Sequence, residues 1–215
     1  MFTGIIEDIG TVKSIEIRGA SGRITIKTAL DTDCMTTGES IAVDGACLTV
    51  TGVSKGVFKA DLSAETKRVT TLGGLKPGAA VNLEKAVTLA KPLGGHLVTG
   101  HVDGVGAIKR KTRTGDFMDI EFTVPAGLLV QVVKKGPVAV DGISLTVAEI
   151  NPDGFTASVV PHTLERTTLS AKPDGFGVNI ETDIIAKYVE RFLRTRRPEG
   201  ITEEFLSEHG FLKRG

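Results

Sequence analysis

An internal repeat constrains this chain more than any other feature. The segment IAVDGACLTV at residues 41–50 returns as VAVDGISLTV at residues 138–147, identical at 7 of 10 positions and offset by 97. Near the N-terminus, MFTGIIEDIGTVK at residues 1–13 matches LVTGHVDGVGAIK at residues 97–109. A repeat with only two long copies indicates duplication of a whole domain, because solenoids stack shorter and more numerous units.

The repeat divides the chain into two domains and a tail. Residues 1–86 and 97–183 are the two copies, and residues 87–96, with one proline and two glycines, form the natural linker. Residues 184–215 follow the second copy and have no counterpart between the copies. We therefore expect two similar domains in tandem and a separate C-terminal segment.

Each copy has the pattern of short β-strands. Residues 23–28 (RITIKT) alternate between polar and apolar side chains, as in a half-buried strand. The Asp-Gly pairs at 44–45 and 141–142 accept the positive φ angles of tight hairpin turns. Short helical turns are expected only within 63–72 and 161–169. Several short strands in a domain of this size predict a small closed barrel, so the fold class is all-β, with two β-barrels in tandem.

The tail has the pattern of an amphipathic helix. Its apolar residues recur at helical spacing: Ile184, Ile185, Tyr188, Val189, Phe192 and Leu193. The arginines lie off that stripe, and a proline and a glycine end the helix: Arg191, Arg194, Arg196, Arg197, Pro198 and Gly200. The stripe fits equally well against the chain's own barrel or against another subunit.

Composition excludes several classes of protein. The 26 basic and 26 acidic side chains cancel, which argues against nucleic acid as the main partner, since phosphate binding needs a basic excess. No apolar run approaches a membrane span, and the N-terminus lacks the basic region of a secretion signal. Cys34 and Cys47 are too few for a disulfide framework, so a reducing cytoplasm is the expected location.

The strand after each Asp-Gly turn offers a candidate ligand face. Cys47 and Thr49 share one face of the strand, and the intervening apolar residues share the other. Ser144 and Thr146 repeat this arrangement in the second copy. Small polar side chains could simply line a solvent face, but their recurrence in both copies favours two related pockets.

Differences between the copies indicate where their roles have separated. The largest chemical changes are Ile5 to His101, Cys47 to Ser144, and Glu65 to His162. A histidine beside a serine is compatible with general base catalysis, because histidine titrates near neutral pH. From the residues alone, a structural, hydrogen-bonded histidine is the simpler interpretation.

Other chemistries find no support in the sequence. No zinc-binding spacing, phosphate-binding loop, dinucleotide-binding fingerprint or G-x-S-x-G motif is present, so neither a metal nor a nucleotide cofactor is expected. The basic run at 109–113 is interpreted as a solvated turn between strands. Lys134 and Lys135 precede a strand, where one ammonium could lie over a pocket mouth or both could be solvated.

Several motifs together resemble one known family. MFTGI, the two DG-x-[CS]-LTV segments, GGHLVTGHVDG and HTLERTTL resemble riboflavin synthase of the alpha-chain type, from Met1 to about Val189. The resemblance implies two six-stranded Greek-key barrels, a C-terminal helix that assembles a homotrimer, and no cofactor. The active site would form where the N-barrel of one subunit meets the C-barrel of the next.

The resemblance also implies a reaction. Two 6,7-dimethyl-8-ribityllumazine molecules, one per barrel, would undergo a dismutation to riboflavin and 5-amino-6-ribitylaminouracil, the last step of riboflavin biosynthesis. The acidic C7 methyl group needs a base or a proton relay. In some organisms such proteins associate with lumazine synthase, a further partner that this resemblance suggests.

Site residues follow by matching motifs. For catalysis the resemblance implies Phe2, Thr3, Cys47, His101, Ser144, Thr146 and Asp183. For the N-barrel site it implies Gly4, Ile5, Ile6, Cys47, Leu48, Thr49, Asp61, Leu62, Ser63 and Thr66. For the C-barrel site it implies Gly100, His101, Val102, Lys135, Ser144, Leu145, Thr146, Val160, Pro161, His162 and Thr163. His162 stands where some relatives carry glutamate, and Asp183 could instead cap a helix.

A non-catalytic protein of the same fold is the competing interpretation. Lumazine proteins share the duplicated barrel but bind a lumazine or flavin as a light-emitting antenna. The presence of His101, Ser144, Thr146, Lys135 and Asp183 favours the enzyme. A flavin reductase barrel is not supported, because nothing after the barrels resembles a nicotinamide domain.

Overall fold

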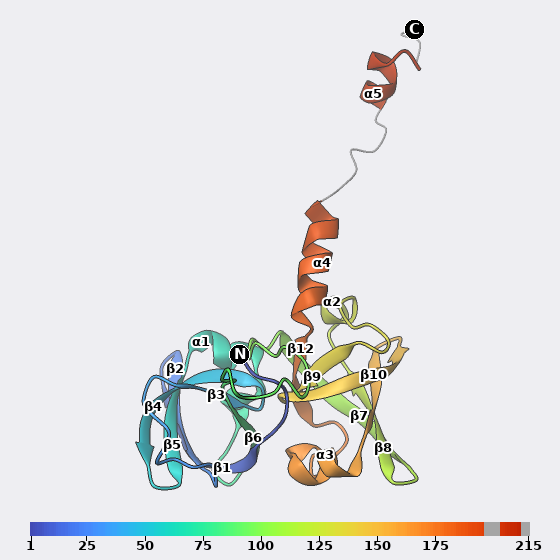
Figure 1. Ribbon diagram of the computed structural model, residues 1–215. Coiled ribbons are helices and arrows are strands. Elements are labelled where there is room, and N and C mark those ends of the chain that lie inside the picture. The colour runs from blue at the N-terminus through green and yellow to red at the C-terminus, as the bar shows by residue number, and fades with distance from the viewer. Residues whose placement is uncertain (196–202, 212–215) are drawn as a thin grey trace.

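The computed structural model describes residues 1–195 and 203–211. Two closed antiparallel β-barrels lie side by side, and one helix projects away from them (Figure 1). The duplicated all-β architecture predicted from the repeat is confirmed. In the described part of the chain, no helix has the length and apolar character needed to cross a membrane.

The first barrel contains six strands in a Greek-key order. Around the barrel they follow one another as β1, β2, β5, β4, β3 and β6. Their bounds are β1 (Asp8–Arg18), β2 (Ser21–Lys27), β3 (Ser40–Val43), β4 (Ala46–Ser54), β5 (Val57–Leu62) and β6 (Ala80–Lys85). The alternating residues of β2 place Ile24 and Ile26 in the barrel core, as period-2 patterning requires.

The second barrel repeats this topology. Its closed order is β7, β8, β11, β10, β9 and β12. The bounds are β7 (Gly104–Thr114), β8 (Phe117–Thr123), β9 (Pro137–Val140), β10 (Ile143–Asn151), β11 (Gly154–Val159) and β12 (Gly177–Thr182). Phe122 and Phe155 pack in its core with their ring centroids 5.2 Å apart.

Short helices close the barrels in the two segments where the sequence predicted helical turns, and one further short helix in the second barrel was not predicted. In the first barrel these are α1 (Ala64–Val69) and η1 (Thr71–Gly74). The second barrel has α2 (Ala126–Leu129), α3 (Pro161–Arg166) and η2 (Thr168–Ser170). Ser63 caps α1 by accepting a hydrogen bond from the Thr66 amide at 2.9 Å.

The Asp-Gly turns adopt the predicted conformation. Asp44 and Gly45 have φ angles of 41° and 79°, and Asp141 and Gly142 have 47° and 77°. Both central residues of each turn therefore lie in the left-handed region, as a type I′ hairpin requires. Each turn projects one buried aspartate into the interface between the barrels.

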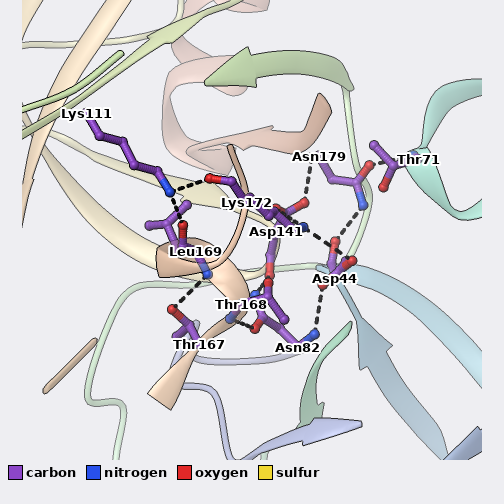
Figure 2. A network of polar contacts seen from close by, with 10 residues as sticks. All are labelled: Asp44, Thr71, Asn82, Lys111, Asp141, Thr167, Thr168, Leu169, Lys172 and Asn179. Atoms are coloured by element: carbon purple, nitrogen blue, oxygen red, sulfur yellow. Dashed lines mark hydrogen bonds and ion pairs between the residues drawn. The ribbon is translucent and has the colours of Figure 1, made fainter. Parts of the chain in front are cut away.

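Reciprocal hydrogen bonds between equivalent residues join the two barrels. The Asn82 side chain donates to the Asp141 carbonyl at 3.0 Å and accepts from the Thr168 amide at 2.8 Å. Asn179 makes the same two contacts with the first barrel, at 2.7 and 2.8 Å (Figure 2). This exchange gives the barrel pair an approximate twofold symmetry and holds the barrels in one relative orientation.

One buried lysine breaks that symmetry. The ammonium of Lys172 lies 2.6 Å from the Asp141 carboxylate and 3.6 Å from that of Asp44 (Figure 2). The offset of 97 places Leu75 at the equivalent position of the first copy. Two buried carboxylates therefore share a single cation. Burial and the neighbouring Asp141 raise the pKa of Asp44 to about 7.

The basic run at 109–113 is not the solvated turn that the sequence predicted. It lies on β7, because β7 stays paired with β8 as far as the hairpin. Arg110 pairs with Glu121 across these strands at 3.1 Å. Lys111 donates to the Leu169 carbonyl at 2.6 Å and so ties the strand to η2. Local pairing thus satisfies these charges without ending the strand.

The C-terminal helix α4 (Ile184–Thr195) projects beyond the second barrel, and α5 (Glu203–Glu208) follows it (Figure 1). Most of the predicted apolar stripe is exposed: Ile185, Tyr188, Val189, Phe192 and Leu193. The stripe therefore does not pack on the chain's own barrel. The residues Arg196, Arg197, Pro198 and Gly200 lie outside the described residues.

The first turn of α4 does have a counterpart, contrary to the expectation for the tail. Lys187 pairs with Asp103 at 2.7 Å, and Lys91 of the linker pairs with Glu7 at 2.7 Å. Lys187 is offset from Lys91 by 96 positions, and Asp103 is offset from Glu7 by the same number. The repeat thus continues through the linker and into the helix. Only Ala90 and Lys91 of the linker are identical to their counterparts, Ala186 and Lys187, which explains why similarity alone did not indicate this extension.

Candidate functional site

Each barrel has a hollow beside the strand that follows its Asp-Gly turn. The first hollow, about 200 Å³, contains Cys47 of β4 and one side of α1. The second hollow, about 90 Å³, contains Ser144 of β10 and the equivalent part of α3. The predicted ligand face thus borders a hollow in both copies. Small-molecule sites usually enclose roughly 300–1,000 Å³, so each hollow needs a further wall to enclose a ligand.

The segments that complete the two hollows are exchanged between the barrels. Residues 4–6 line the second hollow, and residues 100–102 line the first. The sequence assigned them the other way round, each to its own copy. Backbone hydrogen bonds explain the exchange: the Cys47 amide donates to the Gly100 carbonyl at 2.9 Å, and the Ser144 amide donates to the Gly4 carbonyl at 2.8 Å.

A buried glutamate anchors each exchanged segment to its own barrel. Glu84 accepts hydrogen bonds from the Thr3 amide at 2.8 Å, its hydroxyl at 2.7 Å and the Gly4 amide at 2.9 Å. Glu181 accepts the equivalent three bonds in the second copy, at 2.7, 2.7 and 3.0 Å. Each segment is therefore fixed at one end to its own barrel while its next residues line the hollow of the other barrel. Sequence reasoning missed both glutamates, although VNLE and VNIE recur at the repeat offset.

Glycine is required where these segments cross. Gly4 and Gly100 have φ angles of 76° and 81°, which other residues rarely adopt. A Cβ atom on Gly4 would lie 2.6 Å from the Ser144 Cβ, and one on Gly100 would lie 2.5 Å from the Cys47 Cβ. The glycines of the MFTG and LVTG motifs are thus required because the backbone there passes close to a strand of the opposite barrel.

A serine–histidine pair distinguishes the second hollow. The His96 Nδ1 atom lies 2.7 Å from the Ser144 Oγ atom. Gly95 makes this approach feasible, because a Cβ there would lie 2.8 Å from the Ser144 Cβ. Burial lowers the pKa of His96, although Asp183, among other carboxylates, acts in the opposite direction. A neutral imidazole can accept a proton from the serine hydroxyl.

Sequence reasoning missed the role of His96, which entered as part of the GGHLVTGHVDG motif. His101, which it placed beside Ser144, lies instead in the first hollow with Cys47. The offset of 96 leaves no residue equivalent to His96 in the first copy. The GGH segment that ends the linker is the only signal from which the pair could have been inferred.

Other predicted residues lie in the hollows as a group. Ser63, Thr66, Gly100, His101 and Val102 line the first hollow together with Cys47. Gly4, Ile5, Ile6, His162 and Thr163 line the second hollow together with Ser144. Thr49 and Thr146 are exposed, each two residues further along the same strand face.

Several predicted side chains point away from both hollows. Leu48, Leu62 and Leu145 pack in the barrel cores, so only their backbone atoms could face a ligand. Phe2 and Thr3 are fully buried, and Phe2 packs between the barrels and pairs its backbone with Val98. In this chain they position the exchanged segment instead of lining a hollow.

The remaining predicted residues occupy the rims of the barrels. Asp61 forms an ion pair with Arg23 at 2.7 Å on β5 and β2. Lys135 has a positive φ of 67° and an exposed side chain just before β9. Asp183 caps α4 by accepting from the Ile185 amide at 3.0 Å. Val160 and Pro161 begin α3 beside the second hollow.

A larger apolar groove runs along α4, outside both hollows. It measures about 660 Å³ and contains Val130, Val133, Ile185, Val189 and Leu193 among its lining residues. Gln131, Asp183, Glu190 and Arg194 also line the groove, but most of its surface is apolar. Its chemistry fits protein packing better than catalysis.

Comparison with known proteins identifies relatives along nearly the whole chain. The lumazine binding domain model matches residues 3–86 and 99–183. The riboflavin synthase of Bacillus subtilis (strain 168) is 41% identical over 215 residues, covering 98% of this chain and 100% of that protein. The riboflavin synthase of Mycobacterium tuberculosis (strain ATCC 25618 / H37Rv) is 44% identical over 199 residues, covering 91% and 99%.

Solved structures show the same fold. The crystal structure of LumP complexed with 6,7-dimethyl-8-(1'-D-ribityl) lumazine superposes with a TM-score of 0.77 and 26% identity. That of LumP complexed with riboflavin gives a TM-score of 0.78 and 27% identity. Each covers 85% of this chain and 99% of the LumP chain.

Proposed function

Since this chain belongs to the family of duplicated lumazine-binding domain proteins that includes the riboflavin synthases, we propose that it is a transferase that forms riboflavin. Its substrate is 6,7-dimethyl-8-ribityllumazine, and the reaction transfers a four-carbon unit between two such molecules. The products are riboflavin and 5-amino-6-ribitylaminouracil. The observation that carries this proposal is the pair of equivalent hollows at Cys47 and Ser144, which suits two copies of one substrate.

Positioning supplies much of the rate in such a reaction. Two bound lumazines held in register react as if in one molecule, so the entropy of bringing them together is lost on binding. The rigid contacts among the barrel strands, Glu84 and Glu181 favour a fixed geometry for each hollow. No group other than the chain's own side chains and the two substrate molecules is needed in this scheme.

Proton transfer is the second requirement. The C7 methyl group of one lumazine must lose a proton before it can form a carbon–carbon bond. Ser144 lines the second hollow and is hydrogen-bonded to His96 at 2.7 Å, so the pair can relay that proton from the hollow to the imidazole. Cys47, at the equivalent position, contributes a thiol in the first hollow, where His101 is the nearby titratable group.

The direct test is conversion of the pure substrate. The purified chain, mixed with 6,7-dimethyl-8-ribityllumazine and no added metal or cofactor, is expected to release one riboflavin and one pyrimidine for every two lumazines. Chromatography with absorbance detection quantifies both products. Tight binding without product would instead identify a lumazine or flavin carrier, the competing function that the LumP structures represent.

We also infer that the chain assembles into a homotrimer through α4. Tyr188, Val189 and Leu193 are 72%, 51% and 65% exposed on a helix that projects from the barrels. Such a face is unfavourable in water and is best covered by the same face of other copies. Assembly would also supply the missing wall of the small hollows.

Replacing Leu193 by glutamate is therefore expected to dissociate the assembly. A charge at this position opposes burial of the apolar face, so the mass in solution should fall from that of a trimer to that of a monomer of 22.6 kDa. Light scattering coupled to size-exclusion chromatography measures this directly, and riboflavin formation should fall in parallel. Leu89→Glu, the same substitution at a fully exposed leucine of the linker, serves as the control. A trimer that persists in Leu193→Glu would contradict the role of α4.

We infer a cytoplasmic location from the two cysteines, both of which are free thiols. Association with lumazine synthase, which makes the substrate, would bring the two active sites close together. Cosedimentation of the two purified proteins tests that association.

A further inference from the structure

The walls of the two hollows differ in charge at two equivalent positions. In the first hollow these positions are Glu65 and Val69 of α1. In the second hollow they are His162 and Arg166 of α3, each offset by 97. The first wall therefore carries a carboxylate, whereas the second carries a guanidinium and an imidazole.

Neighbouring residues change the net charge of the two walls. In α1, the Arg68 guanidinium pairs with the Glu65 carboxylate at 2.9 Å, so the wall of the first hollow is close to neutral. The equivalent position of α3 is Glu165, which does not line the second hollow. Among residues 1–195 and 203–211, no carboxylate forms an ion pair with Arg166, so its positive charge is available to a ligand.

Glu84, Glu181 and Asp183 are engaged with groups other than Arg166. Glu84 is occupied by the Thr3 and Gly4 donors and by the Lys91 ammonium at 3.1 Å. Asp183 and Glu181 act on the pKa of His96, on the far side of Ser144. The titratable groups that face the second hollow itself are thus His162 and Arg166, with His96 behind Ser144.

We propose that the second hollow binds the lumazine that is deprotonated at its C7 methyl group, and that the first hollow binds the neutral partner. This assignment rests on the proposed function. The methyl C–H bond breaks, its electron pair remains on the lumazine and spreads into the ring, and the proton passes to the Ser144–His96 pair. The resulting anion then has Arg166 beside it, whereas the equivalent position in the first hollow is the uncharged Val69.

Two independent features of the second hollow agree with this assignment. A cationic wall stabilises the anion by direct electrostatic attraction and, where contact is made, by charge-assisted hydrogen bonds. In the second hollow a histidine is hydrogen-bonded to the serine of the strand, whereas His101 lines the first hollow without a hydrogen bond to Cys47 in the described part of the chain. Acid–base chemistry and anion stabilisation thus coincide in one copy, which allows identical substrates to take different roles.

The test exchanges the walls between the copies in the full-length protein. The variant His162→Glu/Arg166→Val gives the second hollow the wall of the first, and Glu65→His/Val69→Arg does the reverse. Exchange of the C7-methyl protons with solvent deuterium, followed by NMR at one fixed pH, measures deprotonation independently of product formation. The absorbance of bound lumazine at the same pH reports the anion.

Exchange and bound anion are expected to fall about tenfold in His162→Glu/Arg166→Val, the loss expected for one hydrogen bond or contact to a charged group. The single variant Arg166→Lys should retain most of the exchange rate of the natural protein, since it keeps the positive charge. Glu65→His/Val69→Arg should raise exchange, because both hollows then favour the anion. Lys109→Val, which removes a surface charge paired with Asp153, controls for net charge and should change exchange less than twofold.

The outcomes separate this assignment from the proposed function. If the natural protein forms no riboflavin, the proposed function is wrong. If the natural protein forms riboflavin but exchange persists at full rate in His162→Glu/Arg166→Val, only the assignment of the anion is wrong. If the double variant does not fold, the single variant Arg166→Lys still tests the assignment. Loss of exchange in Arg166→Lys would contradict the role given to the positive charge at this position.

Discussion

Replacing Lys172 by methionine is expected to lower the free energy of unfolding by about 3–5 kcal/mol, the cost of leaving buried charges uncompensated. Lys172 is 8% exposed and lies between the carboxylates of Asp141 and Asp44, which are 0% and 1% exposed. Without its ammonium, two buried carboxylates would face each other across the barrel interface. Urea denaturation followed by circular dichroism measures the loss.

The pH dependence of this loss has a definite sign. The pKa of Asp44 is raised to about 7 in the folded chain from an ordinary value of 3.8. The folded state therefore holds this proton more tightly, and its contribution to stability is complete below pH 3.8 and is lost as pH rises through about 7. Removing the cation raises the carboxyl pKa further, so the deficit of Lys172→Met should be smallest in acid and grow toward neutral pH.

Two control variants identify the cause of the loss. Lys76→Met removes an exposed lysine from the equivalent loop of the first barrel and should change stability by less than about 0.5 kcal/mol. Adding Asp44→Asn to Lys172→Met should recover part of the lost stability, because it removes one of the two opposed charges. A deficit that is the same at every pH and is not relieved by Asp44→Asn would mean that Lys172 contributes packing and not charge.

Much of the fold could be predicted because the sequence contains the pattern of the same barrel in two copies. The recurring Asp-Gly turns and the alternating strand at 23–28 each limit the backbone to hairpins, and the repeat requires two copies of the same barrel. The β-bulges recur as well, between Val12 and Ser14 in β1 and between Ile108 and Arg110 in β7. Turns and strand alternation are set by residues that are close together in the chain, so a single sequence is enough to predict them.

The arrangement of the candidate site could not be predicted in the same way. Which barrel each segment lines depends on contacts between residues about 50 or 140 positions apart, such as Cys47 with Gly100 and Ser144 with Gly4. The repeat makes the two assignments equivalent in sequence, since Thr3-Gly4 and Thr99-Gly100 match equally well. Only the three-dimensional approach of the barrels selects the exchanged arrangement.

The same limit explains why the positions of the two histidines, His96 and His101, were not predicted. His101 stood out because it replaces Ile5 of the first copy, whereas His96 has no counterpart and so offered no contrast between copies. Comparison of the copies detects substitution but not insertion into a linker. The structure places His101 with Cys47 and His96 with Ser144.

Replacing His96 by alanine is expected to lower kcat about 100-fold, within the range for loss of a proton-transfer group. Its imidazole lies 2.7 Å from Ser144, so it acts on the substrate through the serine as a positioning and proton-accepting residue. Ser144→Ala should cost about as much, and the double variant should cost little more, because residues that act as a unit are not additive. Steady-state formation of riboflavin measures all three.

The pH profile separates this role from a purely structural one. Burial lowers the pKa of His96, so its neutral, proton-accepting form persists below the ordinary value of 6.5. The natural protein should therefore lose kcat only as pH falls below that value, and this acidic limb should disappear in His96→Ala. Cys47→Ala is the matched variant in the first copy, where no hydrogen bond joins the thiol to His101 in the described part of the chain, and it should retain the limb. A limb that survives in His96→Ala but vanishes in Cys47→Ala would place proton transfer in the first hollow and reverse the roles of the two barrels.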